Sequence, residues 1–200
     1  TSFDRDYRFI DSPFFNMYEV IIFKRFIGKS MEAKIIINGV EKDIGIEFLV
    51  EIANSMSDVK ENEDIFYQLA THNSATIREK IAYKNSLDKK TIKLLLQDKD
   101  TKVLDNIVRN QQAIKIFDNN NFEHILKYGN EDTIIEMIGS LTEYECIENL
   151  DECYKKIEEL NNEYLVLKIA SSYTTPKKIL KNLSKSKDID ISNAAKNNLS

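Results

Sequence analysis

The chain has 200 residues, of which 42% are apolar and 30% are charged, and its formal net charge is −5. This is the composition of an ordinary globular protein, and it excludes collagen-like, intrinsically disordered and membrane-spanning chains. Only five glycines and two prolines are present, which excludes most turn-rich all-β folds, because such folds need these residues at their corners.

The N-terminal segment predicts a helix, a hairpin and a second helix. Ser12-Pro13 is a good helix start and Gly28 a good helix stop, on either side of a run of aromatic and aliphatic residues. Asn38-Gly39 lies between two β-branched segments, which is a strong signal for a two-residue hairpin turn. A helix from about residue 44 to residue 54 follows. We expect residues 1–60 to form a helical N-terminal cap that can include one small β-hairpin.

An internal repeat begins after this cap. An anchor residue is followed after eight residues by a β-branched or Leu position, and after four more by Ile or Ala. The anchors are Leu69, Leu95, Leu126, Ile157 and Leu183, and the steps between them are 26, 31, 31 and 26 residues. The clearest alignment places residues 81–95 on residues 169–183 at a constant offset of 88. Periods of roughly 20–50 residues are typical of stacked helical repeats.

Each repeat predicts two short helices, and polar linkers rich in Asp and Asn supply the N-caps. The first helices are expected at residues 76–84, 102–109, 133–139, 164–171 and 191–197. The second helices are expected at residues 89–97, 122–128, 143–150 and 176–184. Neither helix of a pair can bury its apolar face alone, so neighbouring repeats must stack. We therefore predict an all-α fold, a right-handed α-solenoid of four to five two-helix repeats that forms one continuous unit over residues 61–200.

Residues 69–85 resemble the HEAT-like leucine-rich repeat variant family, in which an acidic linker precedes Val-Arg, and Val-Ala, Asn and a Leu-rich second helix follow. The matching residues are Ile77-Arg78, Ile81-Ala82, Asn85, Leu95, Asp98 and Asp100. Val103-Leu104 departs from the pattern because the Arg is missing. The resemblance covers about residues 65–110 and 164–198 and implies a scaffold rather than a particular activity. Some members hold an iron–sulfur cluster on cysteines, and this chain has no such ligand set.

Charge is segregated along the chain. The net charge is −5 over residues 1–77, +5 over 78–115, −10 over 116–165 and +5 over 166–200. Three lysines of one second helix recur in another at the offset of 88, and the acidic repeat has other residues at the matching positions. These candidate contact residues are Lys89, Lys90 and Lys93, then Tyr144, Glu145 and Glu148, then Lys177, Lys178 and Lys181. Exposed helix faces also carry charge for solubility alone.

Motifs for catalysis or metal binding are absent from the sequence. There is no Gly-rich phosphate loop, no His-Glu-x-x-His and no Gly-x-Ser-x-Gly. His72 lies in a linker and His124 beside apolar residues, where a lone histidine is more often structural. Cys146 and Cys153 fit two reduced thiols and complete no zinc-ligand set. We expect a protein that is not an enzyme and that needs no cofactor or metal.

The expected function is a scaffold or adaptor that binds another protein on the concave solenoid surface. There, second helices would present a basic, acidic and basic band, which favours association rate and specificity. The alternative is a nucleic-acid-binding HEAT-like protein similar to DNA glycosylases. Nucleic acid is less favoured, because the acidic segment interrupts the basic track that phosphates need.

The expected location is cytoplasmic, with no membrane partner. The first ten residues are too charged for a signal peptide. The longest apolar stretch falls far short of the roughly 20 residues that span a bilayer. A repeat that stops at Ser200 would leave an apolar face, which would permit self-association through the C-terminal end.

Overall fold

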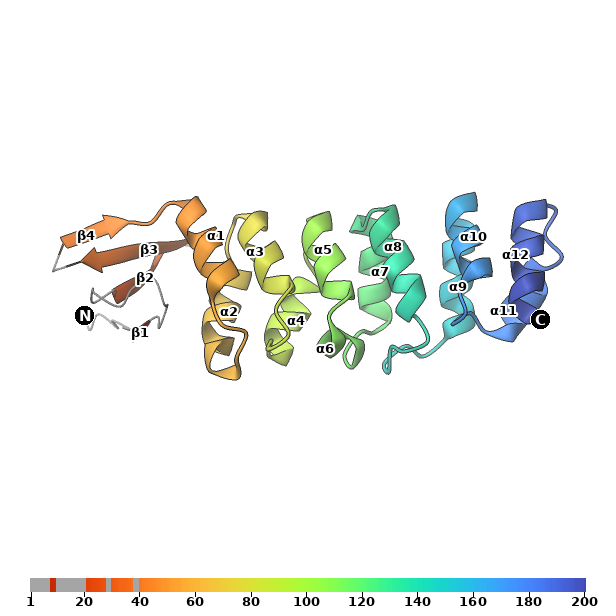
Figure 1. Ribbon diagram of the computed structural model, residues 1–200, viewed down its shortest axis with the longest axis horizontal. Coiled ribbons are helices and arrows are strands. Elements are labelled where there is room, and N and C mark those ends of the chain that lie inside the picture. Colours follow the sequence, from red (N-terminus) through yellow and green to blue (C-terminus); the bar gives the residue numbers. More distant parts are fainter. Residues whose placement is uncertain (1–7, 10–20, 28–29, 38–39) are drawn as a thin grey trace. The chain divides into compact units, whose positions relative to one another are not determined.

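The structure is a computed structural model that describes residues 8–9, 21–27, 30–37 and 40–200, with side chains from residue 44 onwards. It divides into two compact parts, Thr1–Thr91 and Ile92–Ser200, which we call unit 1 and unit 2. From residue 44 onwards every regular element is a helix, which confirms the all-α class for this part of the chain (Figure 1). The sequence-based division into residues 1–60 and 61–200 stays a prediction.

Unit 1 begins with an antiparallel sheet of order β1-β2-β3-β4. The strands are β1 (Arg8–Phe9), β2 (Ile21–Ile27), β3 (Ser30–Ile37) and β4 (Val40–Asp43). Ile37 pairs with Val40, which confirms the predicted hairpin, although its turn residues Asn38-Gly39 lie outside the described residues. The cap is therefore not wholly helical.

The helix predicted between Ser12 and Gly28 is wrong over its second half, because Ile21–Ile27 forms β2. These residues are mostly β-branched or aromatic, and every one of them pairs with a residue of β3. Such side chains favour a pleated, paired segment over an isolated helix. The first half of the predicted helix lies outside the described residues.

The helices of unit 1 follow the sheet. They are α1 (Ile46–Ser55), the 3-10 helix η1 (Lys60–Asn62), α2 (Glu63–Ala70) and α3 (Ala75–Ala82), and α4 (Lys89–Leu95) begins here and ends in unit 2. Helix α1 confirms the helix predicted over residues 44–54, and both α1 and α2 pack against α3. The Asp58 carboxylate accepts the backbone N–H groups of Asn85 and Ser86 at 2.7 Å each. This contact joins the loop after α1 to the loop after α3.

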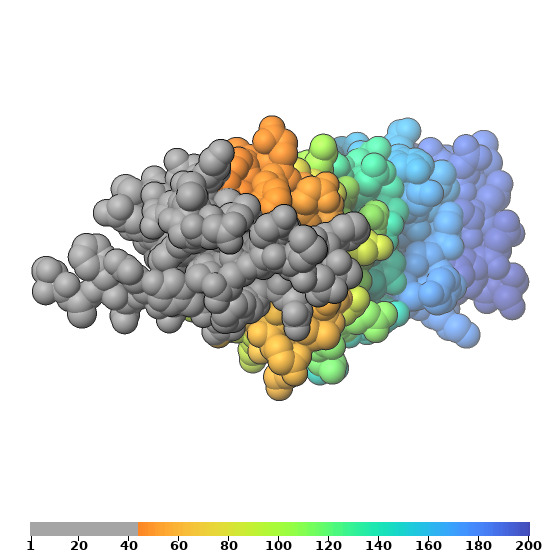
Figure 2. Space-filling model, turned by 60° about the vertical axis from the view of Figure 1, so that its left-hand side comes forward, coloured from red at the N-terminus to blue at the C-terminus, as the bar shows by residue number. Residues whose placement is uncertain are grey.

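Unit 2 contains two layers of helices. Its complete helices are α5 (Thr101–Val108), α6 (Gln111–Ile114), α7 (Asn119–Tyr128), α8 (Glu131–Ser140), α9 (Leu150–Glu159), α10 (Glu163–Ser171), α11 (Lys177–Leu183) and α12 (Ile189–Leu199). The first layer consists of α5, α8, α10 and α12, each in contact with the next (Figure 1). The second layer consists of α7, α9 and α11, which pack on α8, α10 and α12 respectively. In Figure 2 the colours of this unit run from green to blue in chain order, so each repeat lies beside its neighbours in sequence.

The repeat register follows from equivalent buried positions of the second helices. Ile92, Phe122, Tyr154 and Leu180 are all buried, and the steps between them are 30, 32 and 26 residues. All five predicted first helices are confirmed, as α3, α5, α8, α10 and α12. Three of the four predicted second helices are confirmed, as α4, α7 and α11.

The second helix predicted at residues 143–150 is wrong. Residues 142–149 form a loop, and the second helix of this repeat is α9, which begins at Leu150. The loop is held against α6 and the start of α7. Its Tyr144 ring stacks on Phe117 with the ring centroids 4.0 Å apart, and Cys146 forms a parallel bridge with Asp118. We call residues 142–149 the strap.

Polar contacts between repeats have a narrow range of sequence separation. Most side-chain hydrogen bonds that join different repeats connect positions 26 to 35 apart. One example is the Arg109 guanidinium, which donates to the Glu136 carboxylate at 3.1 Å. The Ser192 hydroxyl of α12 also donates to the Ser184 carbonyl oxygen at the end of α11, eight positions earlier. Within unit 2, each repeat therefore contacts its neighbours in sequence.

The polar linkers supply N-caps, as predicted. The side chains of Asp100, Asn130, Asn162 and Asp188 accept backbone N–H groups at the start of the first-layer helices. Such caps typically contribute about 1 kcal/mol each to helix stability. The linkers therefore fix where each first-layer helix begins.

His72 belongs to a turn that recurs at the same position in three repeats. Its Nδ1 accepts the Ser74 N–H at 2.9 Å, just as Asp98 Oδ1 accepts the Asp100 N–H and Ser186 Oγ accepts the Asp188 N–H. Arg78, part of the family-like Ile77-Arg78 pair, donates to the carbonyl oxygens of His72 and Asn73. The histidine therefore closes a turn as a neutral acceptor.

We expect His72 to make folding sensitive to mild acid. Burial lowers the pKa of His72 below its ordinary 6.5, and the charge of Arg78 lowers it further. Below 6.5 the unfolded chain therefore binds more protons than the folded chain, and stability is lost as the pH falls from 6.5 through the folded pKa. Asn at this position keeps an acceptor two residues before Ser74 but does not titrate. Urea midpoints at about pH 7.5 and about pH 5.5 should differ less for His72→Asn than for the wild type; an unchanged difference would contradict this role.

Candidate protein-binding surface

The exposed side of the second layer is strongly polar. In α9, for example, Cys153, Tyr154 and Ile157 are buried, so the 3.6-residue period turns Asp151, Glu152, Lys155 and Glu159 outwards. We call the exposed residues of α7, α9 and α11 the second-layer surface. Its principal members are Asn119, Asn120, Glu123, Lys127, Asp151, Glu152, Lys155, Lys177, Lys178 and Lys181.

Ion pairs cross this surface from helix to helix. The Lys156 ammonium of α9 pairs with Glu123 of α7, and also lies 3.4 Å from Glu152 Oε1 on its own helix. The Lys178 ammonium of α11 pairs with Asp151 of α9. These groups are largely exposed, so each pair contributes only about 0–1 kcal/mol to stability. The pairs orient the side chains more than they stabilise the fold.

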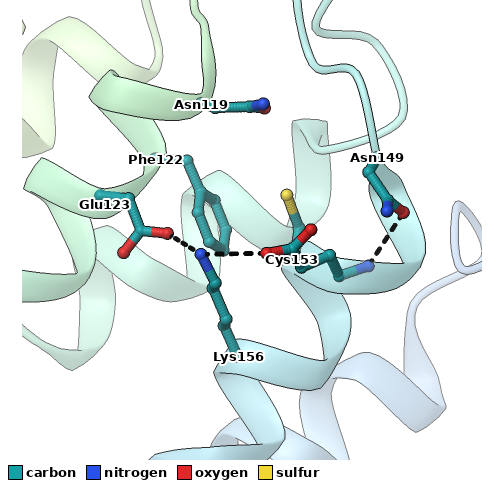
Figure 3. A pocket seen from close by; sticks show the side chains of 7 residues that line it. Asn119, Phe122, Glu123, Asn149, Cys153 and Lys156 are labelled. Atoms are coloured by element: carbon teal, nitrogen blue, oxygen red, sulfur yellow. Dashed lines mark hydrogen bonds and ion pairs between the residues drawn. The ribbon is translucent and has the colours of Figure 1, made fainter.

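A small pocket of about 50 Å³ lies between α7 and α9 (Figure 3). It is lined by Asn119, Phe122, Glu123, Asn149, Glu152, Cys153 and Lys156. Figure 3 shows the Lys156 ammonium group directed toward the Glu123 carboxylate, at the edge of the Phe122 ring. The pocket is far smaller than the roughly 300 Å³ of an ordinary small-molecule site. It has room for a few water molecules or for the end of one side chain of a partner.

The Cys153 thiol in this pocket is not activated. Burial raises the pKa of Cys153 to about 11, Lys156 acts in the opposite direction, and Glu152 and Glu123 raise it further. The thiol is therefore protonated at neutral pH, whereas a nucleophilic cysteine needs thiolate character. The chemistry of this pocket is polar contact rather than covalent reaction.

The predicted lysine contacts are all exposed. Lys89 and Lys90 lie on the part of α4 that belongs to unit 1, where the Lys90 ammonium lies 3.5 Å from the centre of the Tyr67 ring. Lys93 lies on the part of α4 in unit 2, and the remaining three, Lys177, Lys178 and Lys181, lie on α11. Among the residues that the structure describes, Lys177 and Lys181 have no ion-pair partner.

The predicted acidic contacts differ from expectation because they lie in the strap. Glu145 and Glu148 are exposed there, but Tyr144 is only 5% exposed, so its side chain is not available to a partner. Aligned by buried positions, the α9 residues that match Lys177, Lys178 and Lys181 are instead Asp151, Glu152 and Lys155. A sequence signal could have located this helix and its charged residues. Asn149 is a good N-cap, and an apolar stripe follows it at residues 150, 153, 154 and 157.

Three further observations bear on the kind of site. No group of three His, Cys, Asp or Glu side chains among the described residues is placed to hold a metal ion. None of the described helices is both long enough and apolar enough to cross a membrane. His124 Nε2 donates to the Asp98 carbonyl oxygen at 2.6 Å, so this histidine, like His72, bonds to a loop.

Comparison with protein-family models, with curated proteins and with solved structures found no match for this chain.

Proposed function

We propose that the protein is a scaffold or adaptor that binds another protein through the second-layer surface, and that unit 2 is part of a right-handed, HEAT-like α-solenoid. Helix pairs repeat in unit 2, and polar contacts join positions 26 to 35 apart. Repeats that contact only their neighbours are typical of solenoids, whose function is to present an extended surface. The resemblance to leucine-rich repeat variant proteins stays a prediction that agrees with this arrangement.

One observation supports the proposal most directly, namely that the second-layer surface holds charges of both signs on rigid helices. Lys177 and Lys181 of α11 are exposed and have no ion-pair partner among the described residues, and the same is true of Glu145 and Glu148 in the strap that leads into α9. Fixed charges that remain unpaired attract a partner of complementary pattern and discriminate against others.

A protein partner fits this surface better than nucleic acid does. Glu123, Asp151 and Glu152 lie on the helices that precede α11, and they interrupt a path that successive phosphates could follow. Both cysteines are free thiols, which is typical of a reducing compartment and supports the proposed cytoplasmic location. The proposed role needs no catalytic group, cofactor or metal.

The test is site-specific photo-crosslinking of the full chain in a native cell lysate, with and without nuclease. A p-benzoylphenylalanine at Lys181 samples the second-layer surface, and one at Asn193, exposed on α12, samples the first layer as a matched control. We expect a discrete protein adduct from the first position only, one that resists nuclease and is lost in a Lys177→Glu variant with an unchanged melting temperature. Equal adducts from both positions would contradict the proposal, and adducts that disappear with nuclease would favour nucleic acid.

A further inference from the structure

Three cationic or ionisable side chains gather around one tyrosine at the C-terminal end of α7. The ammonium groups of Lys127 and Lys99 lie 4.9 Å and 5.6 Å from the centre of the Tyr128 ring. The His124 ring lies 4.6 Å from the same ring, tilted by 40°. We call these four residues the α7-end cluster; Lys127 also belongs to the second-layer surface.

The cluster is built on an anchored frame. His124 Nε2 donates to the Asp98 carbonyl oxygen, and this bond links α7 to the loop that contains Lys99. Since His124 also packs on Tyr128, one histidine contacts both the phenol ring and that loop. The two lysines are exposed and can move, whereas the ring between them is partly buried. A fixed aromatic ring with two flexible cations beside it is suited to binding an anionic group from solution.

The carboxylates next to Lys99 in sequence, and Glu123 on α7, bond to groups other than the two lysines. Asp98 Oδ1 accepts the Asp100 N–H, Asp100 Oδ1 accepts the Lys102 N–H, and Glu123 pairs with Lys156. Neither Lys99 nor Lys127 has an ion-pair partner among the described residues. Two ammonium groups therefore lie near one phenol ring, and neither of them forms an ion pair with a described carboxylate.

The surroundings of the Tyr128 phenol favour its ionised form. Hydrogen bonding by Lys127 lowers the pKa of Tyr128, slight burial opposes this, and the charges of Lys127 and Lys99 lower it further. The surroundings thus stabilise negative charge on an oxygen at this position. The same surroundings would stabilise an oxygen anion supplied by another molecule.

We propose that Lys99, Lys127 and Tyr128 form an anchor for a single oxyanion, a carboxylate or phosphoryl group on an extended segment of the protein partner. Both lysines are flexible enough to close on one such group beside the phenol hydroxyl, which can donate to it. This inference rests on the proposed function, because it assigns a partner chemistry to one end of the second-layer surface.

Acidic residues around the cluster limit the anchor to one anion. Glu131 and Asp132, exposed at the start of α8, follow Tyr128 by three and four residues. In the next repeat, at the step of 32 residues, Glu159 occupies the position of Lys127, and Glu158 precedes it. A nucleic-acid backbone would bring several phosphates past these carboxylates, whereas a peptide can bring one oxyanion between neutral residues.

The experiment measures fluorescence anisotropy of labelled probes with the full chain at low salt. The probes are a Gly-Ser peptide with one Glu, the same peptide with one phosphoserine, a neutral peptide and an oligothymidylate. The test variant combines Lys99→Gln and Lys127→Gln. The matched control combines Lys185→Gln and Lys187→Gln, which removes the same charge from two exposed lysines of the α11–α12 loop. Circular dichroism checks that both variants fold.

We expect the phosphoserine or Glu peptide to bind more tightly than the neutral peptide. Binding should weaken by about tenfold in the test variant and by less than about twofold in the control. The comparison of the two peptides tells whether phosphoryl or carboxylate is preferred. A smaller loss in Tyr128→Phe, which keeps the ring and removes the hydroxyl, would support donation by the phenol.

Three results would overturn the anchor. Equal losses in both double variants would show diffuse attraction by positive charge, and so would equal affinity for the neutral peptide. No binding of either charged peptide would also overturn it. In these cases the photo-crosslink from Lys181 would still decide the proposed function separately. Tighter binding of the oligothymidylate through the same lysines would overturn the anchor for peptides and favour the nucleic-acid alternative.

Discussion

Replacing Tyr144 with Phe should raise the free energy of unfolding by about 1 kcal/mol, because the substitution removes a buried hydroxyl that has no partner. The Tyr144 ring is 5% exposed, and its hydroxyl makes no hydrogen bond with any described residue. Burial raises the pKa of Tyr144, and the charges of Glu143 and Glu136 raise it further, so the phenol stays neutral.

Tyr144→Ala should have the opposite and larger effect, a loss of about 3–5 kcal/mol, because it removes the ring that holds the strap on Phe117. Urea unfolding of the full chain measures both variants. Tyr173→Phe, at a side chain that is 90% exposed, is the control and should change stability by less than about 0.5 kcal/mol. A Tyr144→Phe variant that is less stable than the wild type would show that the hydroxyl has a partner.

Gly129→Ala should destabilise unit 2 by about 1–3 kcal/mol, because there is no room for a methyl group at this helix end. A Cβ at Gly129 would lie 2.7 Å from the Ile125 carbonyl oxygen and 3.2 Å from Thr133 Cβ. The backbone of α7 or the start of α8 must shift to relieve these contacts. Lower urea midpoints and faster hydrogen exchange in α7 and α8 are the expected results.

Gly139→Ala is the matched substitution in the neighbouring helix. Nothing lies within 4 Å of a Cβ built at Gly139, which is exposed within α8. Alanine favours a helix over glycine by about 0.5–1 kcal/mol, so this variant should be more stable than the wild type. Equal effects at the two glycines would contradict the contact described at Gly129.

The first helix of each repeat could be predicted from sequence because its burial is one-sided and periodic. Ile77 and Ile81, or Leu165 and Ile169, are spaced by one helical turn and are buried, and capping residues such as Asn162 and Asp188 mark where these helices begin. The hairpin that pairs Ile37 with Val40 was equally local, since the Asn-Gly dipeptide in the sequence is enough to predict it. Local chemistry decides both kinds of element.

Strand β2 and the strap could not be predicted, because each depends on contacts with residues far away in the sequence. The residues of β2 gain their strand partners from β3, so a plausible helix start and stop on either side misled the prediction. In the acidic repeat, a regular step of 31 residues favoured a helix at 143–150. The strap occupies that interval instead, because Tyr144 finds a buried position on Phe117.

The sequence predicted which side chains of the candidate site are exposed. It did not predict which side chains of different helices lie together. Lys177 and Lys181 are exposed, as the helical period requires. Lys178 pairs with Asp151, and Lys156 pairs with Glu123, each across two helices. The sequence alignment missed these pairs because the strap moves the second helix of the acidic repeat from residues 143–150 to α9. The α7-end cluster likewise brings together Lys99 and Tyr128 from different repeats.

The limited span of the contacts between repeats has a consequence for cooperativity. Since the hydrogen bonds between repeats of unit 2 span at most 35 positions, we expect its folding to nucleate in one repeat and to spread in either direction. Loss of one interface would let the helices on its two sides melt separately. A ligand that touches α7 and α11 at once would supply the long-range coupling that the chain itself lacks, and occupancy would make several repeats melt as one.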